Sequence, residues 1–227
     1  MKGQQLPLPV QLRESASFAS FHAGPNDNVV TALRSLSGPV LIYGAAGSGR
    51  THLLQAVARE RRCPYLPLLD LHDAGTEALD GLEGTAALCL DDVQAVLAQR
   101  DWALALLRLL DTRRTLNKPT VLAADAAPER IDCILPDLRT RLSACAVFGL
   151  KPLSDTDRAD LLHERAHARG LELPPETSRW LLNQLARDTG SLLDALEKLD
   201  RASLSAKRRL TLPFAQSVLA PGISRTG

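Results

Sequence analysis

Apolar residues recur along the chain in short runs that alternate with longer amphipathic stretches. The stretch 101–117 has an apolar side chain every three or four residues, which predicts a helix with one buried face. A second helix is predicted over 51–62, and residues 73–84, rich in Gly and Asp, predict a loop. Strands alternating with helices predict a parallel sheet with helical crossovers, an α/β fold. The predicted strands are 39–43, 65–70, 86–91, 120–124 and 146–149, and the helical face comprises Trp102, Ala105, Leu106, Leu109 and Leu110.

The pattern changes to helix alone after Pro152. Ser154 with Asp157 predicts a helix start, Gly170 its end, and Pro175 the first turn of the next helix. Ser191 with Asp194 predicts the cap of a third helix, whose buried face would be Leu192, Ala195, Leu196 and Leu199. We therefore expect an α/β domain over 18–151 and a small all-α domain over 152–221. Residues 1–17 are expected to be a tail, because Pro7 and Pro9 exclude a helix there.

Composition narrows the class of protein further. Hydrophobic residues make up 45% and charged residues 23%, which is typical of a globular protein, and the 4% of aromatics leaves the core to Leu, Ala and Val. The net charge of +1 gives no general attraction to nucleic acid. The basic run 207–209 fits either a solvated helix end or a contact patch.

The four cysteines form no Cys-x-x-Cys pair, which argues against a zinc site. No signal peptide and no membrane-length apolar run is present, so a cytoplasmic location with no membrane partner is expected.

Residues 44–51 match the P-loop pattern G-x-x-x-x-G-K-[ST], except that Arg50 replaces the lysine. Glycines at these positions let the backbone N–H groups surround a phosphate, and the following helix adds its positive N-terminal end. Thr51 can place its hydroxyl on a phosphate-bound Mg²⁺. Arginine is longer and forked, so we expect ATP handling to be weakened and ADP binding to be kept. The alternative is a Gly-rich turn between a strand and a helix. The predicted set is Gly44, Gly47, Ser48, Gly49, Arg50, Thr51 and His52.

Two further predicted strands end in carboxylates. Asp91 and Asp92 end the strand 86–91, which suits a Walker B element with Asp91 near Mg²⁺ and Asp92 near an attacking water. Asp125 follows the strand 120–124, where AAA+ proteins keep the polar residue called sensor 1. Each of these residues could also be an ordinary turn residue. Their occurrence after a P-loop favours the nucleotide-site interpretation.

Several segments together resemble the Hda family, AAA+ regulators related to the replication initiator DnaA. They are 18–21 with 24–26, the P-loop form 50–54, and the stretches 135–142 and 199–214. The resemblance covers nearly the whole chain and implies an AAA+ domain followed by an α-helical lid. It implies a protein that binds ADP, docks on the DNA-loaded sliding clamp of DNA polymerase III, and makes DnaA hydrolyse its ATP. Contact with DNA would then be indirect, through the clamp, and no DNA-binding helix-turn-helix domain is expected.

The resemblance also assigns roles to individual residues. Arg141 matches the arginine finger that reaches the γ-phosphate of a neighbouring molecule; without the resemblance it would read as a surface salt bridge on a short helix after Pro136. Asn26 matches the segment near the adenine. The clamp-binding peptide matches the tail, where an extended, proline-held segment would lose little entropy on docking. The residues of this peptide are Gln5, Leu6, Leu8, Pro9 and Val10.

One position departs from the family pattern. Gly190 stands where relatives carry the sensor 2 arginine, and Arg187, one turn earlier, is the candidate substitute. This change and Arg50 both favour a protein that holds nucleotide over a fast ATPase. The competing functions are an autonomous AAA+ ATPase, such as a helicase loader that uses Asp91 and Asp92 on its own ATP, and an initiator-like DNA-binding protein. The sequence leaves the oligomeric state open, and a homodimer that covers Arg141 is compatible with it.

Overall fold

The structure is a computed structural model that describes residues 16–185, 189–206 and 208–219. These residues divide into two compact units. The first contains 16–45 and 50–150, and the second contains 46–49 and 151–219. The tail segment with Gln5, Leu6, Leu8, Pro9 and Val10 lies outside the described residues, as does Arg187.

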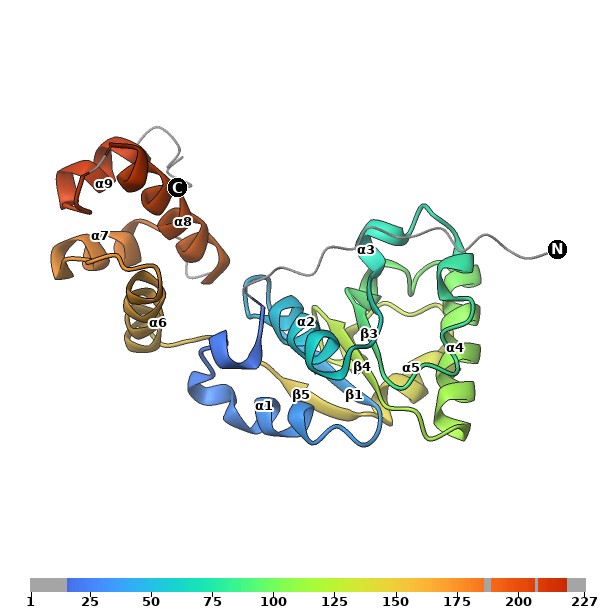
Figure 1. Ribbon diagram of the computed structural model, residues 1–227. Helices are drawn as coiled ribbons and strands as arrows, with labels where there is room; N and C mark the ends of the chain where they lie inside the picture. The colour runs from blue at the N-terminus through green and yellow to red at the C-terminus, as the bar shows by residue number, and fades with distance from the viewer. Residues whose placement is uncertain (1–15, 186–188, 207, 220–227) are drawn as a thin grey trace. The chain divides into compact units, whose positions relative to one another are not determined.

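A five-stranded parallel sheet in the order β2-β3-β4-β1-β5 forms the centre of the first unit, as the alternating pattern predicted (Figure 1). The carboxyl ends of β1, β3 and β4 therefore lie at one edge, with β4 between the other two, and this is where α/β proteins bind ligands. The strands are β1 (Val40–Tyr43), β2 (Tyr65–Pro67), β3 (Leu88–Asp91), β4 (Thr120–Ala124) and β5 (Ala146–Gly149).

Helices cover both faces of this sheet because strand side chains alternate between them. Val40 and Ile42 of β1 pack in one hydrophobic cluster with α1 and α2, whereas Leu41 packs in the other with α4 and α5. The central strands are buried on both sides, which explains their continuous apolar sequences. The helices of this unit are α1 (Asp27–Arg34), α2 (Arg50–Arg61), α3 (Leu68–Leu71), α4 (Arg100–Thr115) and α5 (Pro136–Ser143).

Two local predictions for this unit need correction. The strand predicted over 65–70 ends at Pro67, and the next four residues form α3. Leu68 and Leu71 are buried and Leu69 is 53% exposed, a helical spacing that a short apolar run does not distinguish from a strand. The loop predicted over 73–84 contains a 3-10 helix, Thr76–Leu79.

The start of the described chain is packed against the domain. Ala16 is buried, and Ser17 caps the 3-10 helix Phe18–Ser20 in a reciprocal capping box with Ser20. These contacts explain why Ala16 and Ser17 do not belong to the tail predicted over 1–17.

The second unit is helical, as predicted, with α6 (Asp155–Ala168), α7 (Pro175–Gln184), α8 (Thr189–Ala206) and α9 (Leu212–Leu219). Ser154 forms the predicted capping box with Asp157, and Gly170 adopts a φ of +69° just after α6. The buried face predicted for α8 is confirmed. Its predicted start at Ser191 is wrong, because Thr189 and Gly190 are already helical.

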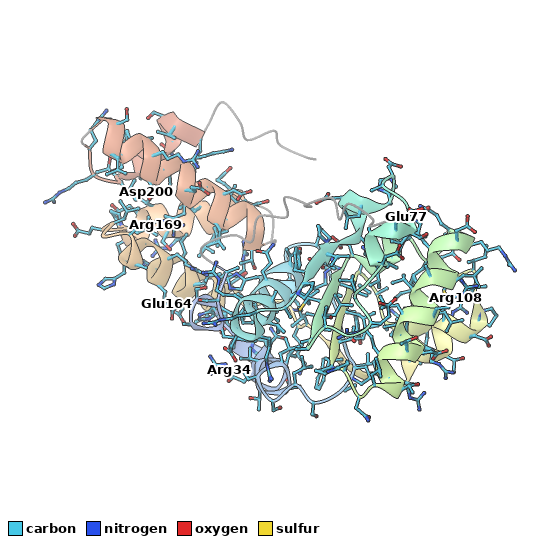
Figure 2. The ribbon with its side chains drawn as sticks, turned by 45° about the vertical axis from the view of Figure 1, so that its right-hand side comes forward. Arg34, Glu77, Arg108, Glu164, Arg169 and Asp200 are labelled. Carbon is cyan, nitrogen blue, oxygen red and sulfur yellow. The ribbon has the colours of Figure 1, made fainter. Side chains whose placement is uncertain are left out.

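Polar contacts supplement the apolar core of the second unit. The buried Thr177 hydroxyl donates to the Leu210 carbonyl at 3.0 Å, which ties α7 to the segment before α9. Arg169, after the end of α6, forms an ion pair with Asp200 of α8 at 3.6 Å; both residues are labelled in Figure 2. Within the described residues, no helix is long and apolar enough to cross a membrane.

Candidate nucleotide site

The predicted P-loop connects β1 to α2. Gly47 and Gly49 have φ values of +74° and +95°, a region that side-chain-bearing residues rarely adopt. The Gly44 N–H donates to the Ala124 carbonyl at 3.3 Å, which continues the β1–β4 pairing to the start of the loop. The helix α2 begins at Arg50, so its positive N-terminal end faces the loop.

Asp91 lies at the carboxyl end of β3 and is 1% exposed. The Tyr65 hydroxyl donates to its Oδ2 at 2.8 Å, and the Asp92 N–H donates to its Oδ1 at 3.0 Å. Burial raises the pKa of Asp91, and the hydrogen bond with Thr51 acts in the opposite direction. The side chains predicted to hold Mg²⁺, Thr51 and Asp91, therefore contact each other across α2 and β3.

Asp92 has a left-handed backbone with φ of +51°, and that turns its carboxylate toward the P-loop arginine. Its Oδ1 lies 3.6 Å from Arg50 Nη2, with side-chain exposures of 21% and 13% respectively. Oδ1 also accepts a hydrogen bond from Gln94 Nε2 at 3.0 Å. The second of the two predicted Walker B carboxylates thus forms an ion pair with the residue that replaces the P-loop lysine.

Gln94 is a residue of the site that sequence reasoning missed. Its amide nitrogen binds Asp92, and its amide oxygen accepts the Asp125 N–H at 3.2 Å. Gln94 lies in the 3-10 helix Val93–Ala95, directly after β3. It therefore connects the predicted Walker B and sensor 1 positions, and a glutamine two residues after the paired carboxylates was the available signal.

Two buried polar atoms indicate that the site suits a phosphate. Arg50 Nη1 and Ser48 Oγ are inaccessible and have no hydrogen-bond partner among the described residues. Leaving buried donors unpaired is costly, and phosphate oxygens are acceptors that would satisfy both. Within the same residues, no group of three His, Cys, Asp or Glu side chains could hold a metal. The groups predicted to hold Mg²⁺ are Thr51, Asp91 and the phosphates themselves, a common arrangement for this ion.

His52 and Asn26 occupy positions beside the loop. His52 Nε2 lies 2.9 Å from the Ser17 carbonyl, and its ring centroid lies 5.6 Å from that of Phe21. The imidazole thus holds the start of the described chain against α2. Asn26 is 2% exposed and directly precedes α1. A role of either side chain in binding nucleotide stays a prediction.

Arg141 lies on α5, and its Nε donates to Asp111 Oδ1 of α4 at 2.5 Å. Its side chain is 38% exposed, so the guanidinium is tethered at the surface. Arg139, on the same helix, instead donates to the Cys133 carbonyl at 3.3 Å. The two arginines of this short helix therefore have different partners.

Comparisons with known proteins agree with this geometry. The family described as Hda, lid domain matches residues 155–219, which span α6 to α9. An uncharacterized protein of Haemophilus influenzae is 36% identical over 95% of this chain and 98% of its own length. Domain III of Thermotoga maritima DnaA superposes with a TM-score of 0.80, at 22% identity over 94% of this chain and 99% of that one. AMPPCP-bound DnaA of Aquifex aeolicus superposes with a TM-score of 0.70 and is 23% identical over 86% of this chain and 71% of that one.

A P-loop between β1 and α2, paired carboxylates after β3 and a helical second unit define an AAA+ protein. Within that class, the chain belongs to the Hda and DnaA-related family.

Proposed function

We propose that this chain is a negative regulator of replication initiation that binds ADP, docks on the sliding clamp and stimulates hydrolysis of DnaA-bound ATP. In this proposal Arg141 acts in trans, as an arginine finger. The family membership and the similarity to DnaA structures support a DnaA-related replication protein. A DnaA-like nucleotide domain is a natural partner for DnaA, because AAA+ sites commonly form between neighbouring subunits.

The observation that carries the proposal is the position of Arg141 at the surface of α5. A finger must reach a phosphate held by another molecule, and a 38% exposed side chain is available for such a contact. The pair with Asp111 is a surface ion pair, a type that contributes only about 0–1 kcal/mol to stability. Because Asp111 contacts only Nε, the rest of the guanidinium remains available to a phosphate on another molecule.

The chain's own nucleotide site is better suited to binding a nucleotide than to hydrolysing it. Asp92, the carboxylate predicted to orient an attacking water, faces Arg50 at 3.6 Å and Gln94 at 3.0 Å. A carboxylate held by these two side chains is not free to orient a water molecule. ADP in this site would leave Arg50 and Asp92 paired, whereas a γ-phosphate would compete with Asp92 for the arginine.

A second function, that of an autonomous ATPase, also has a specific observation in its favour. Thr51 acts on the pKa of Asp91, so the two oxygen-bearing side chains predicted to hold Mg²⁺ lie near each other. The two functions differ in whose ATP is hydrolysed, so one assay separates them.

That assay measures release of phosphate from radiolabelled ATP preloaded on DnaA, with clamp loaded on DNA and this chain added. The unmodified chain should accelerate hydrolysis, and Arg141→Ala should remove the acceleration, by a factor on the order of 10³ for a trans-acting finger. Arg139→Ala is the matched control, since Arg139 is also exposed on α5 but has a different partner. It should behave as the unmodified chain does.

Two results would refute the regulatory function. One is brisk hydrolysis of free ATP by the purified chain with neither clamp nor DnaA present. The other is equal stimulation of DnaA by Arg141→Ala and by the unmodified chain.

A further inference from the structure

The proposed finger is held by a residue on a different helix. Leu138 and Leu142 of α5 are 0% and 1% exposed, and they fix the rotation of this short helix against the core. Arg141 consequently projects along the surface toward α4, where its Nε meets Asp111 Oδ1. The helices α4 and α5 lie side by side on one face of the sheet (Figure 1).

The geometry of this ion pair leaves the guanidinium fork available. Asp111 binds Nε, and Nη1 and Nη2 of Arg141 make no hydrogen bond to any described residue. The two terminal nitrogens carry four of the five guanidinium N–H groups, and these match phosphate oxygens in a bidentate contact. A carboxylate on Nε therefore restrains the side chain without occupying the part that would bind a phosphate.

The pairing is selective among the arginines near Asp111. Arg108 and Arg114 lie three residues before and after it on α4, a spacing at which opposite charges can pair. Both are exposed, and neither forms an ion pair with it within the described part of the chain; Arg108 is labelled in Figure 2. The structure pairs the carboxylate with the side chain on the neighbouring helix.

From these observations we infer that Asp111 is a positioning residue, which holds Nε of Arg141 so that its terminal nitrogens are presented to the phosphate of a second molecule. The inference rests on the proposed function. A free arginine side chain populates many rotamers, and ordering it costs up to about 2 kcal/mol of conformational entropy. Asp111 supplies that ordering before the partner arrives, so its loss should slow the chemical step and leave binding of the partner unchanged.

The test is a steady-state titration of ATP-bound DnaA against the chain in the presence of DNA-loaded clamp. Asp111→Ala should lower the maximal stimulated rate roughly tenfold, as expected for a misplaced catalytic group. The DnaA concentration for half-maximal rate should stay within about twofold. Asp111→Asn keeps an acceptor oxygen and removes the charge. Its maximal stimulated rate should lie between those of the unmodified chain and Asp111→Ala. Asp101→Ala, an exposed acid on the same helix, is the matched control and should leave both quantities unchanged.

A double-mutant cycle separates positioning from general damage. Asp111→Ala added to Arg141→Ala should cause no further loss of rate, because the two residues act as one unit. As a direct check on the pair, the Arg141 Nε–H resonance should be protected from solvent exchange in the unmodified chain and lose that protection in Asp111→Ala.

The outcomes distinguish the inference from the proposed function. If the unmodified chain does not stimulate DnaA, the proposed function fails, whatever the Nε–H signal shows. If stimulation depends on Arg141 but Asp111→Ala is as active as the unmodified chain, or faster, the positioning role alone is overturned. The positioning role would also be overturned if Asp111→Ala lowered the stimulated rate further when added to Arg141→Ala.

Discussion

Arg50 and Asp92 face each other across the predicted phosphate site, with Nη2 and Oδ1 3.6 Å apart. The first residue takes the place of the P-loop lysine, and the second is the Walker B carboxylate predicted to orient water. Lysine presents a compact charge, whereas the guanidinium is longer and forked, so Arg50 reaches Asp92 from the P-loop. Arginine at position 50 therefore connects the P-loop to the carboxylate after β3. This contact should affect whether ADP or ATP binds more tightly.

ADP should bind this chain more tightly than ATP, because a γ-phosphate competes with Asp92 for Arg50. Isothermal titration calorimetry with Mg²⁺ should give an ADP affinity about tenfold or more above that of ATP, a difference of roughly 1.4 kcal/mol. Arg50→Lys should narrow this difference and raise slow intrinsic hydrolysis severalfold, since it frees Asp92. Arg62→Lys, an exposed arginine just after α2, should change neither property. Tighter binding of ATP by the unmodified chain would contradict this account of Arg50.

Asp91→Asn should stabilise the nucleotide-free protein near neutral pH, by roughly 1 kcal/mol, a typical size for a point mutation. Burial raises the pKa of Asp91 above its ordinary value of 3.8, so the folded state binds a proton more tightly than the unfolded state. The stability of the unmodified protein should then fall relative to Asp91→Asn as pH rises from that ordinary value through the raised one. Urea unfolding at several pH values measures this difference.

The same substitution should remove the Mg²⁺-dependent part of nucleotide binding, which needs the ionised carboxylate. Asp101→Asn, an exposed change on α4, controls for the loss of one negative charge. An Asp91→Asn protein that is less stable than the unmodified one across the whole pH range would refute the assignment of burial as the dominant effect on this carboxylate.

Capture of this chain by the sliding clamp should depend on Gln5 and Leu6. The double substitution Gln5→Ala with Leu6→Ala should abolish retention on immobilised clamp and leave the thermal unfolding midpoint unchanged. The matched control is Gln11→Ala with Leu12→Ala, which removes the same two side-chain types just outside the proposed peptide. Equal retention of both double variants would remove the clamp-binding assignment. Surface plasmon resonance gives the comparison directly.

Arg113→Ala should destabilise the first unit strongly, by about 3 kcal/mol or more. Arg113 is 1% exposed, and its guanidinium donates to the Thr120 hydroxyl and to the carbonyls of Leu82 and Pro119. Truncation would remove these buried hydrogen bonds and open a cavity between α4 and β4. Arg114→Ala, the exposed neighbour on α4, should have an effect within about 0.5 kcal/mol. Urea unfolding should show the contrast, and similar midpoints for the two variants would contradict it.

The elements of this fold follow from local patterns that a sequence carries by itself. Continuous apolar runs marked β1, β3 and β4, since a strand buried on both faces needs no polar alternation. The glycines of the P-loop, the carboxylates at 91–92 and the capping box at Ser154 were readable for the same reason. Each depends on the backbone conformation or hydrogen bonding of residues that are close together in the chain. Local pattern was insufficient at α3, where the four residues Leu68–Leu71 are too few to distinguish a helical period from that of a strand.

The partners of the site residues were decided only by tertiary structure. Tyr65 reaches Asp91, Gln94 bridges Asp92 to the Asp125 backbone, and Asp111 holds Arg141 from a helix thirty residues away in sequence. Such contacts depend on strand order and on how helices pack against the sheet, and no periodicity in the sequence records them. The sequence thus determined which residues could bind nucleotide and donate a finger. The packing of α4 against α5, and of β3 beside β4, decided which carboxylate each arginine meets.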